Sequence, residues 1–520
     1  MAWATLLALL ASSASAALAS LGHDFQCDLP DPVDPDSDGL PSANQLFSSD
    51  AALKLQIERL RASVQIATVC YDDMGNYGDD ERWKPFYQLH EMLDQTYPKL
   101  HQHTKRETVN DIGLVYTIQG SDSDLKPILL LAHQDVVPVE SQESEAWEHP
   151  PFDGFYDSDG WLHGRGAVDK SSLTSIMSAF EALFAADADW KPERTMVLAF
   201  GFDEECGGLR GAPSISEHLK QRYGQDGIAV ILDEGGAGLN TLGDTLWALP
   251  AVYEKGYLDV WFDLSVQGGP SGTPPPNTAI GIMSEIVTGL EQDPFQPSIP
   301  RDGPIHHQLI CQARYSPDAV PQLTTAIYNG DLDLAATLMA NISRHTQSAV
   351  QTTRAIDYMA GGSKINSLPE YVTLGINHRF TPQDNKYQVM HDIAHKSRQV
   401  LADHDITLVP FEDDNNYHAW VKAHGLESSR WPPSYPDHPY PGRPYPGHPP
   451  FQPPFHPPHQ RPYPRPSPDI PHWRPDYHGK LTLSTKRSFD PSPVSPTQGP
   501  VWDLFAGTLR HTLGAAHQTV

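Results

Sequence analysis

Histidine and carboxylate side chains follow three apolar runs of the sequence, and residues of these types bind metal ions. The first run leads into "LLLAHQDVVPVE", where His133 and Asp135 are two residues apart. The second leads into "FGFDEECGG", with acids at residues 203–205, and the third into "AVILDEGG", with acids at residues 233 and 234. Asp169, in "WLHGRGAVDKSS", is expected at the start of a helix. Taken singly, each has an ordinary explanation, such as a surface-loop histidine or an N-cap aspartate.

Taken together, these side chains predict a cation site. If the apolar runs are neighbouring strands of an α/β sheet, their carboxyl ends meet at one edge, where ligands bind. So much negative charge in a partly desolvated place requires a cation. Oxygen and imidazole ligands suit zinc, with manganese and cobalt as alternatives. An H-x-D pair also fits a ligand histidine whose ring is oriented by a nearby carboxylate.

The elements that must position these residues can be read from the hydrophobic pattern. Strands are expected over Pro127–His133, Thr195–Gly201 and Gly227–Asp233. Between the first two lies an i, i+3, i+4, i+7 stripe, which is typical of a helix packed on a sheet. The stripe consists of Leu173, Ile176, Met177, Phe180, Leu183 and Phe184. Strands buried on both faces that alternate with helices indicate an α/β sheet covered on both sides.

A longer set of motifs resembles a known family. The chain carries, in this order, "HQDVVPV", "GRGAVDK", "GFDEECGGLRGA", "ILDEGG", "EKGYLDV", "GGSKINSLPE", "NHRF" and "PSPVSP". This order resembles the carboxypeptidase S branch of the co-catalytic zinc metallopeptidases, a group that also contains aminoacylases and N-acyl-amino-acid hydrolases. The similarity runs from about residue 50 to 514.

The resemblance implies a fold and a reaction. The fold would be α/β, with a mixed, largely parallel sheet covered by helices as in zinc exopeptidases, and a smaller α+β domain acting as a lid or dimerisation domain. The reaction would be hydrolysis of the C-terminal peptide bond of small peptides of the Gly-Xaa type, or of N-acyl amino acids, by water activated at two zinc ions. A homodimer through the lid domain is also implied.

The resemblance further assigns roles to individual residues. The implied metal ligands are His133, Asp169, Glu205 and Asp233. Asp169 would bridge the two zinc ions, Asp135 would orient His133, and Glu204 would be the general base that takes a proton from the attacking water. Arg379 and Asn366 match family positions near the carboxylate side of the substrate.

The sequence departs from the family pattern at three places. The loop after Asp169 is one residue short, and the lid motif "GGPSGTPPPNT" has Pro270 and Asn277 where the family has histidines. In the family, the first of these histidines is expected to stabilise the oxyanion. Loss of one oxyanion donor typically costs about 100- to 1000-fold in rate. The chain stops at "AAHQTV", before the family's last metal-binding histidine, and neither His511 nor His517 lies in the matching context. The second zinc site is therefore expected to be incomplete.

The composition shifts along the chain, together with the family resemblance, predict seven segments. They are a signal peptide or signal anchor (1–20), a leader (21–48), the first part of a catalytic domain (49–255), the lid or dimerisation domain (256–372), the second part of the catalytic domain (373–430), a proline-rich insertion (431–478) and a shortened catalytic end (479–520). Proline at the density of residues 431–477 excludes helix and sheet. The histidines of this segment fit a solvated spacer better than a metal site.

Charge and targeting signals limit the partners and the compartment. The formal net charge of −29, from 65 acidic and 36 basic residues, argues against nucleic acid as a partner. The four cysteines form no CxxC motif, so neither a disulfide scaffold nor a cysteine zinc site is indicated. The apolar N-terminus, with A-S-A at residues 14–16, predicts the secretory pathway, with a vacuolar or extracellular destination. "NIS" at Asn341 would be a glycan acceptor there.

Two other functions stay open at the level of the sequence. One is a catalytically impaired relative that keeps the metal-binding fold. The other is a secreted interaction protein whose proline-rich segment binds aromatic-lined modules. The second alternative leaves the clustered acids and histidine unexplained.

Overall fold

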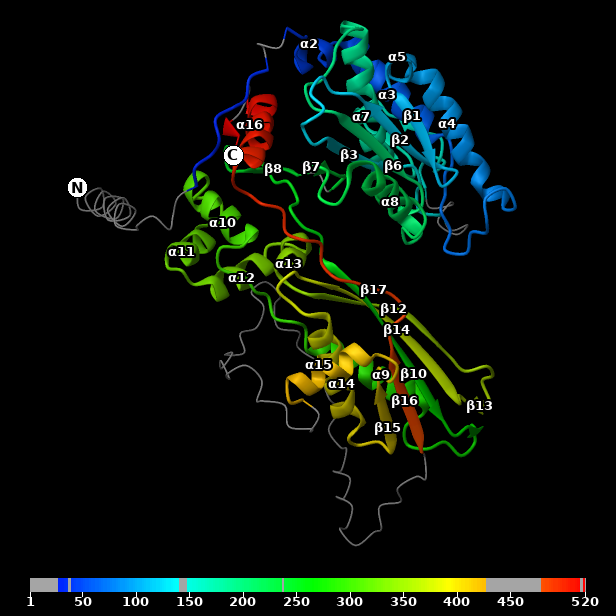
Figure 1. Ribbon diagram of the computed structural model, residues 1–520. Helices are drawn as coiled ribbons and strands as arrows, with labels where there is room; N and C mark the ends of the chain where they lie inside the picture. The colour runs from blue at the N-terminus through cyan, green and yellow to red at the C-terminus, as the bar shows by residue number, and fades with distance from the viewer. Residues whose placement is uncertain are drawn as a thin grey trace, which may run out of the picture. The chain divides into compact units, whose positions relative to one another are not determined.

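The computed structural model describes residues 27–35, 39–139, 147–235, 238–426, 478–514 and 518–519. The chain divides into two compact units. We call Asp28–Ala251 with Thr497–Val520 the site unit, and Met1–Cys27 with Val252–Pro496 the insertion unit. Both contain sheets and helices, so the prediction of a mixed α/β protein is confirmed (Figure 1).

The site unit is built on a five-stranded mixed sheet in the order β1-β2-β6-β3-β7. Its strands are β1 (Lys105–Val109), β2 (Gly113–Ile118), β3 (Ile128–His133), β6 (Met196–Gly201) and β7 (Val230–Leu232). Strands β6, β3 and β7 are parallel to one another, whereas β1 and β2 are antiparallel to their neighbours. The three predicted strands are therefore adjacent and parallel, and their carboxyl ends lie at the same edge of the sheet.

Alternation along these strands divides the core into two layers, one on each face. On one face, Leu198 and Phe200 of β6 pack with helices α4 (Lys84–Thr96), α5 (Pro98–His103) and α7 (Ala167–Ala186). On the other face, Val197 and Ala199 pack against α8 (Gly211–Tyr223). Helix α3 (Asp50–Val64) packs against α7.

The predicted helical stripe is α7, whose buried side chains include Leu173, Met177 and Phe184. The third strand differs from its prediction. In β7, Ile231 is 59 % exposed, because this strand pairs only with β3 among the described residues.

The remaining elements of the site unit are mostly short. They are α2 (Ala43–Phe47), η3 (Glu81–Trp83), β4 (Phe155–Tyr156), β5 (Leu162–His163), η4 (Glu204–Cys206), β8 (Leu239–Leu242), β9 (Thr245–Ala248), α16 (Pro500–Gly514) and β18 (Gln518–Thr519). The segment near Val33 lies against α16, where the Val33 N–H donates to the Gly507 carbonyl at 3.0 Å. A Cβ on Gly507 would lie 2.6 Å from the Asp31 carbonyl oxygen, so a glycine is required at this contact.

The insertion unit has a sheet in the order β12-β14-β10-β16-β15, with β17 beside β10. These strands are β10 (Gly256–Val266), β12 (Thr353–Gly361), β14 (Tyr371–Phe380), β15 (Ile406–Pro410), β16 (Gly479–Ser484) and β17 (Ser488–Phe489), and β11 (Gly269–Pro270) pairs with β13 (Ser367–Leu368). All pairs are antiparallel except β15 with β16. Helices α9 (Ala279–Gln292), α14 (Lys386–Leu401) and α15 (Asn415–Ala423) contribute to its apolar core. Four further helices lie between α9 and β12: α10 (Pro304–Tyr315), α11 (Pro321–Tyr328), α12 (Leu332–Ala340) and α13 (Arg344–Val350).

The predicted boundary of the lid domain at residue 372 is wrong. It cuts through β14, which pairs with β10 from Gly256↔Phe380 to Ser265↔Tyr371 and with β12 on its other side. Residues 373–426 and 479–496, predicted to belong to the catalytic domain, lie in the insertion unit instead. The physical reason is that β15 and β16 complete the same sheet and bury their apolar residues against α9 and α14.

The cysteines also differ from their prediction, because all four are paired. Cys27 is bonded to Cys311 within the insertion unit, and Cys70 to Cys206 within the site unit. Separations of 284 and 136 residues left no local spacing that could reveal these pairs.

Several predicted features lie outside the described residues: the signal segment at 1–20, the proline-rich run at 431–477 and His517. Within the described ranges, no helix has the length and apolarity needed to cross a membrane.

Candidate metal centre

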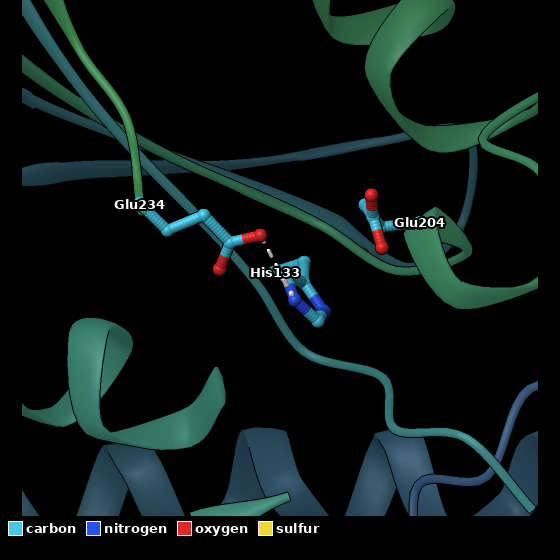
Figure 2. A group of neighbouring side chains, drawn as sticks. All are labelled: His133, Glu204 and Glu234. Atoms are coloured by element: carbon cyan, nitrogen blue, oxygen red, sulfur yellow. Dashed lines mark ion pairs between the residues drawn. The ribbon is translucent and has the colours of Figure 1, made fainter. Parts of the chain in front are cut away.

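His133 ends β3 and is held between two carboxylates. It is 5 % exposed, and its Nδ1 lies 3.1 Å from Asp135 Oδ1. Its Nε2 lies 3.2 Å from Glu234 Oε1 (Figure 2). Burial lowers the pKa of His133, but the hydrogen bonds to these two carboxylates outweigh burial and raise it to about 11. The surroundings of this imidazole therefore favour positive charge.

Asp135 connects two loops of the site. Its side chain is completely buried, and while Oδ1 faces His133, Oδ2 accepts the backbone N–H of Glu205 at 2.9 Å. The carboxylate predicted to orient His133 thus also holds the backbone of the acidic loop after β6.

Asp169 lies in the first turn of α7, where a negative charge is favoured by the helix dipole. The start of this helix is fixed by close packing, since a Cβ on Gly166 would lie 2.0 Å from Val136 Cγ1. The φ of Gly166, +75°, also belongs to the region that favours glycine. Burial raises the pKa of Asp169, the charge of His133 lowers it, and those of Glu234 and Asp135 raise it further.

Lys170 anchors the same turn and was missed by the sequence reasoning. It is almost fully buried, and its Nζ donates to the carbonyls of Ser63 at 2.7 Å and Ile66 at 2.6 Å. Burial lowers its pKa to about 7. A buried lysine that binds one carbonyl in the last turn of α3 and one just beyond its end ties the start of α7 to the end of α3. The polar type of this residue beside an apolar stripe gave no sign of burial.

The three acids after β6 have separate environments. Asp203 is 3 % exposed and accepts the N–H groups of Arg210 at 2.7 Å and Gly211 at 2.8 Å, so it caps α8. Glu204 is exposed and Glu205 is half-buried. Burial, followed by the charges of Asp169 and Glu204, raises the pKa of Glu205 to about 7. Asp203, to which the sequence assigned no role, therefore has a structural one.

Two overlapping sets of side chains could hold a metal ion. In each set the donor atoms all lie within 4.8 Å of one another. The sets are His133 with Asp169 and Glu205, and His133 with Glu204 and Glu234. The structure thus brings together the predicted residues His133, Asp169, Glu204 and Glu205, with Asp135 behind them.

Asp233 belongs to neither set among the described residues, and Glu234 lies beside His133 instead. Asp233 Oδ1 accepts the N–H of Glu234 at 2.9 Å. Both residues follow the end of β7 at Leu232, and of the two only Glu234 belongs to a set of possible metal ligands among the described residues. The sequence pattern "LDEGG" does not tell which one, and the resemblance had assigned the first.

Arg379 and Asn366, the predicted substrate residues, belong to the insertion unit. Arg379 is exposed on β14, with its guanidinium 4.8 Å from the centre of the Tyr257 ring. Asn366 is exposed, and its carbonyl accepts the Ser271 N–H at 3.4 Å, next to the strand pair formed by β11 and β13. Both side chains are accessible within their unit.

Two other residues singled out in the sequence have ordinary surroundings. His511, on α16 of the site unit, has Nε2 4.0 Å from Asp34 Oδ1 and belongs to neither metal set. Pro270 forms part of β11 and is exposed.

Comparison with known proteins gives relatives that cover much of the chain. It is 42 % identical to an uncharacterized carboxypeptidase of Schizosaccharomyces pombe over 344 residues, which is 66 % of this chain and 56 % of that protein. It is 33 % identical to carboxypeptidase S of Saccharomyces cerevisiae over 496 residues, covering 94 % of this chain and 76 % of the relative. An N-fatty-acyl-amino acid synthase/hydrolase of Mus musculus is 31 % identical over 371 residues, with 70 % and 69 % covered.

The chain spans little more than half the length of the Schizosaccharomyces relative but about three quarters of carboxypeptidase S. The model of one peptidase family matches residues 129–518, the region that carries His133, Asp169 and the acidic loop. The predicted resemblance is confirmed, and the chain belongs to Peptidase family M20/M25/M40.

Proposed function

We propose that this protein is a metal-dependent carboxypeptidase or N-acyl-amino-acid hydrolase that acts on small peptides or N-acyl amino acids. The observation that carries the proposal is the set formed by His133, Asp169 and Glu205, whose donor atoms lie within 4.8 Å of one another beside the exposed Glu204. Membership of the M20/M25/M40 family supports it, as do the names of the relatives, carboxypeptidase S and N-fatty-acyl-amino acid synthase/hydrolase.

The residues of this set fit a zinc ion. Catalytic zinc sites use three protein ligands, mostly nitrogen and oxygen donors, and leave one position open. His133, Asp169 and Glu205 would supply these three ligands, with Asp233 or Glu234 beside them. The raised pKa values of Asp169 and Glu205 follow from burial and from the neighbouring carboxylates, and a cation would relieve that repulsion. Bound zinc supplies Lewis acidity, which polarises a carbonyl group and acidifies water.

The remaining steps belong to side chains of the chain itself. Glu204 would take a proton from the attacking water and deliver it to the leaving amine nitrogen, so that the hydroxyl group ends on the acyl carbon. Asp135 would keep the imidazole of His133 in the orientation of a ligand, since its Oδ1 lies 3.1 Å from Nδ1. The second zinc ion and the roles of Arg379 and Asn366 at the substrate carboxylate remain parts of this proposal.

We also propose that the protein works in the secretory pathway, in a vacuolar lumen or outside the cell. Two disulfide bonds support an oxidising compartment. Asn341 of the N-x-S motif is exposed at the end of α12, as a glycan acceptor must be. A homodimer through the insertion unit is supported by β12, which pairs only with β14 among the described strands.

The proposal is tested on the purified full chain. Zinc bound per chain is measured, and hydrolysis of a dipeptide with glycine before its C-terminal residue is followed with and without a chelator. Hydrolysis that a chelator abolishes and added zinc restores is the expected result. A folded chain that binds zinc but hydrolyses neither this dipeptide nor an N-acyl amino acid would identify an impaired relative. A folded chain that binds no zinc would overturn the metal site itself.

A further inference from the structure

The acidic loop after β6 has little regular structure of its own. Glu204 and Glu205 lie in η4, a single 3₁₀ turn of three residues, followed by Gly207 and Gly208 with φ values of +106° and +64°. Its local backbone bonds run from the Gly207 N–H to the Glu204 carbonyl and from the Gly208 N–H to the Asp203 carbonyl. Such a short turn is weakly stable alone, so contacts from other segments must determine where the two glutamates lie.

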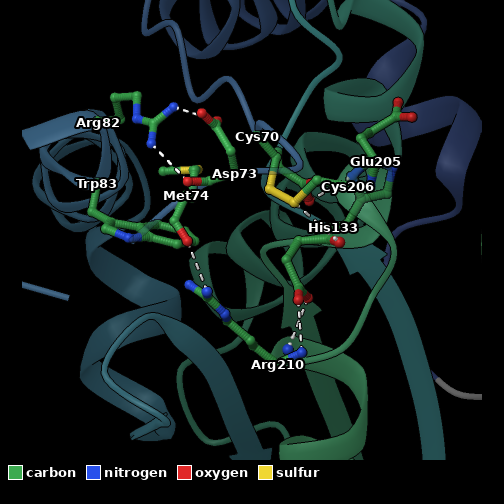
Figure 3. The surroundings of a disulfide bond; sticks show 12 residues. Cys70, Asp73, Met74, Arg82, Trp83, His133, Glu205, Cys206 and Arg210 are labelled. Carbon is green, nitrogen blue, oxygen red and sulfur yellow. Dashed lines mark hydrogen bonds and ion pairs between the residues drawn. A yellow bond between two sulfur atoms is a disulfide. The ribbon is translucent and has the colours of Figure 1, made fainter. Parts of the chain in front are cut away.

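The first of these contacts is covalent. Cys206 directly follows Glu205 and is bonded to Cys70, with 5.5 Å between their Cα atoms (Figure 3). Cys70 is 1 % exposed and packs in an apolar cluster with Trp83, Phe86 and Phe202. The partner cysteine therefore belongs to the core and provides a fixed point.

The segment that carries Cys70 also adjoins the loop after β3. The Cys70 N–H donates to the Val136 carbonyl at 3.0 Å, and the Val136 N–H donates to the Thr68 carbonyl at 3.0 Å. Val136 directly follows Asp135. One short segment, residues 68–70, thus connects the loop of His133 and Asp135 to the loop of the two glutamates.

Arg210 makes the second contact. Its guanidinium donates to the carbonyls of Met74 at 2.8 Å and Gly75 at 2.9 Å (Figure 3). Its backbone N–H donates to the carboxylate of Asp203. The same guanidinium lies 5.6 Å from the centre of the Trp83 ring. The acidic loop is therefore attached to residues 70–83 at two points, through Cys206 and through Arg210.

We infer that the Cys70–Cys206 disulfide and Arg210 are positioning residues, which hold Glu204 and Glu205 in the geometry needed for metal binding and proton transfer. This inference rests on the proposed function. Glu205 would bind the metal, and its N–H is held by Asp135 Oδ2, so a shift of η4 disturbs the ligand and the carboxylate behind His133 together. Without the bond to Cys70, the residue after Glu205 is no longer tied to the core.

The bond also makes the site sensitive to dithiol reductants. A dithiol that reduces the disulfide gives two electrons and two protons, leaves Cys70 and Cys206 as thiols, and becomes a disulfide itself. The loss of the tether is reversible, because reoxidation restores it.

The test compares the two disulfides of the full chain. The Cys70→Ala/Cys206→Ala variant is measured against the Cys27→Ala/Cys311→Ala variant, which lacks the disulfide of the insertion unit instead. For each we determine zinc affinity by competition with a chelator, kcat and KM for the dipeptide, and hydrogen exchange of amides 203–208. Changes around metal ligands typically cost about 10- to 100-fold in affinity or activity. We expect that loss in zinc affinity and in kcat for the first variant, with KM within about 3-fold and faster exchange, and no comparable change for the second.

Variants of Arg210 test the inference independently of the disulfide. Arg210→Ala should weaken zinc binding in the same direction, and Arg210→Lys should rescue it only in part, since lysine lacks the planar fork that reaches two carbonyls. If the cysteine variant fails to fold, reduction of the folded Cys27→Ala/Cys311→Ala protein by a dithiol removes the same bond. The dithiol, which itself binds zinc, is removed before zinc affinity is measured, and reoxidation must restore that affinity.

Each outcome decides a separate question. Equal zinc affinity and kcat with and without the Cys70–Cys206 bond would overturn this inference and leave the proposed function intact. An equal loss in both cysteine variants would also overturn it, because the effect would then not depend on the acidic loop. Absence of zinc binding by the unaltered chain would overturn the proposed function and this inference with it.

Discussion

The sheets of the two units present their strand ends differently. In the site unit, β3, β6 and β7 are parallel, so the residues that follow them gather at one edge of the sheet. In the insertion unit, β12, β14, β10 and β16 each run antiparallel to their neighbours in this order, so neighbouring strands end at opposite edges. Both sets of possible metal ligands found among the described residues belong to the site unit. A parallel arrangement concentrates side chains from distant parts of the sequence.

The insertion unit uses its sheet mainly to bury apolar surface. Buried residues alternate along β10, where Leu258, Val260, Phe262 and Leu264 contact the core that α9 and α14 complete. Changes in the site unit should therefore alter metal binding and turnover, while changes in the core of the insertion unit should alter stability. The predictions below test this separation, from the largest expected effect to the smallest.

The largest effect is expected for Glu204→Gln. The amide cannot take a proton from water, and general-base catalysis contributes about 100- to 10,000-fold, so kcat should fall by that factor. Glu204 is exposed, so the free energy of unfolding should stay within about 0.5 kcal/mol of the unaltered protein. Steady-state kinetics and denaturant unfolding measure the two quantities. Unchanged kcat would remove Glu204 from the mechanism.

The reverse pattern, a loss of stability without a loss of zinc affinity, is expected for Phe262→Ala in the insertion unit. Phe262 is fully buried, and truncation of a buried phenylalanine lowers the free energy of unfolding by about 3–5 kcal/mol. Zinc affinity, measured below the unfolding transition, should not change. Hydrogen exchange of the amides of β10 reports unfolding of this unit. A matching loss of zinc affinity in the folded variant would mean that the core of the insertion unit also affects the metal site.

Glu234→Gln and Asp233→Asn form a matched pair that sharpens the description of the site. Because Glu234, and not Asp233, belongs to a set of possible metal ligands among the described residues, their effects on zinc affinity should be unequal. The distance of 3.2 Å between His133 Nε2 and Glu234 Oε1 favours Glu234 for the larger loss, of about 10- to 100-fold. Chelator competition measures both variants. A larger loss for Asp233→Asn would restore the assignment implied by the family resemblance.

The effect that is smallest near neutral pH concerns the insertion unit alone. His378 is fully buried; burial first, and then the charge of Arg354, lower its pKa from 6.5 to about 3. Below pH 6.5 the unfolded chain therefore binds a proton that the folded chain does not. The stability present above pH 6.5 is lost as the pH falls towards 3, by up to about 1.4 kcal/mol per pH unit.

His378→Gln removes this titration and keeps an acceptor for the Arg354 Nε, which lies 3.3 Å from His378 Nε2. The free energy of unfolding should then depend less steeply on pH between 6.5 and 3, with no change of slope above 6.5. Denaturant unfolding at a series of pH values measures the slope. Identical slopes would show that His378 does not contribute.

The sequence predicted those features that depend on local pattern. Apolar runs and the helical stripe gave the three parallel strands and α7, and the residue types at the strand ends gave the cluster around His133. The boundary at residue 372 was missed because β14 belongs to the insertion unit through pairing with β10, a contact between residues more than 100 positions apart. Similarly, nothing local distinguishes Asp203, which caps α8, from its two glutamate neighbours.

The disulfide between Cys27 and Cys311 has a topological consequence. Residues 28–251, the larger part of the site unit, lie in the sequence between the two segments of the insertion unit, which end at Cys27 and begin again at Val252. The bond therefore closes a covalent ring that contains this whole segment. A single proteolytic cut anywhere in the ring opens it without releasing a fragment, so the nicked protein should migrate as one chain until a reductant separates the pieces.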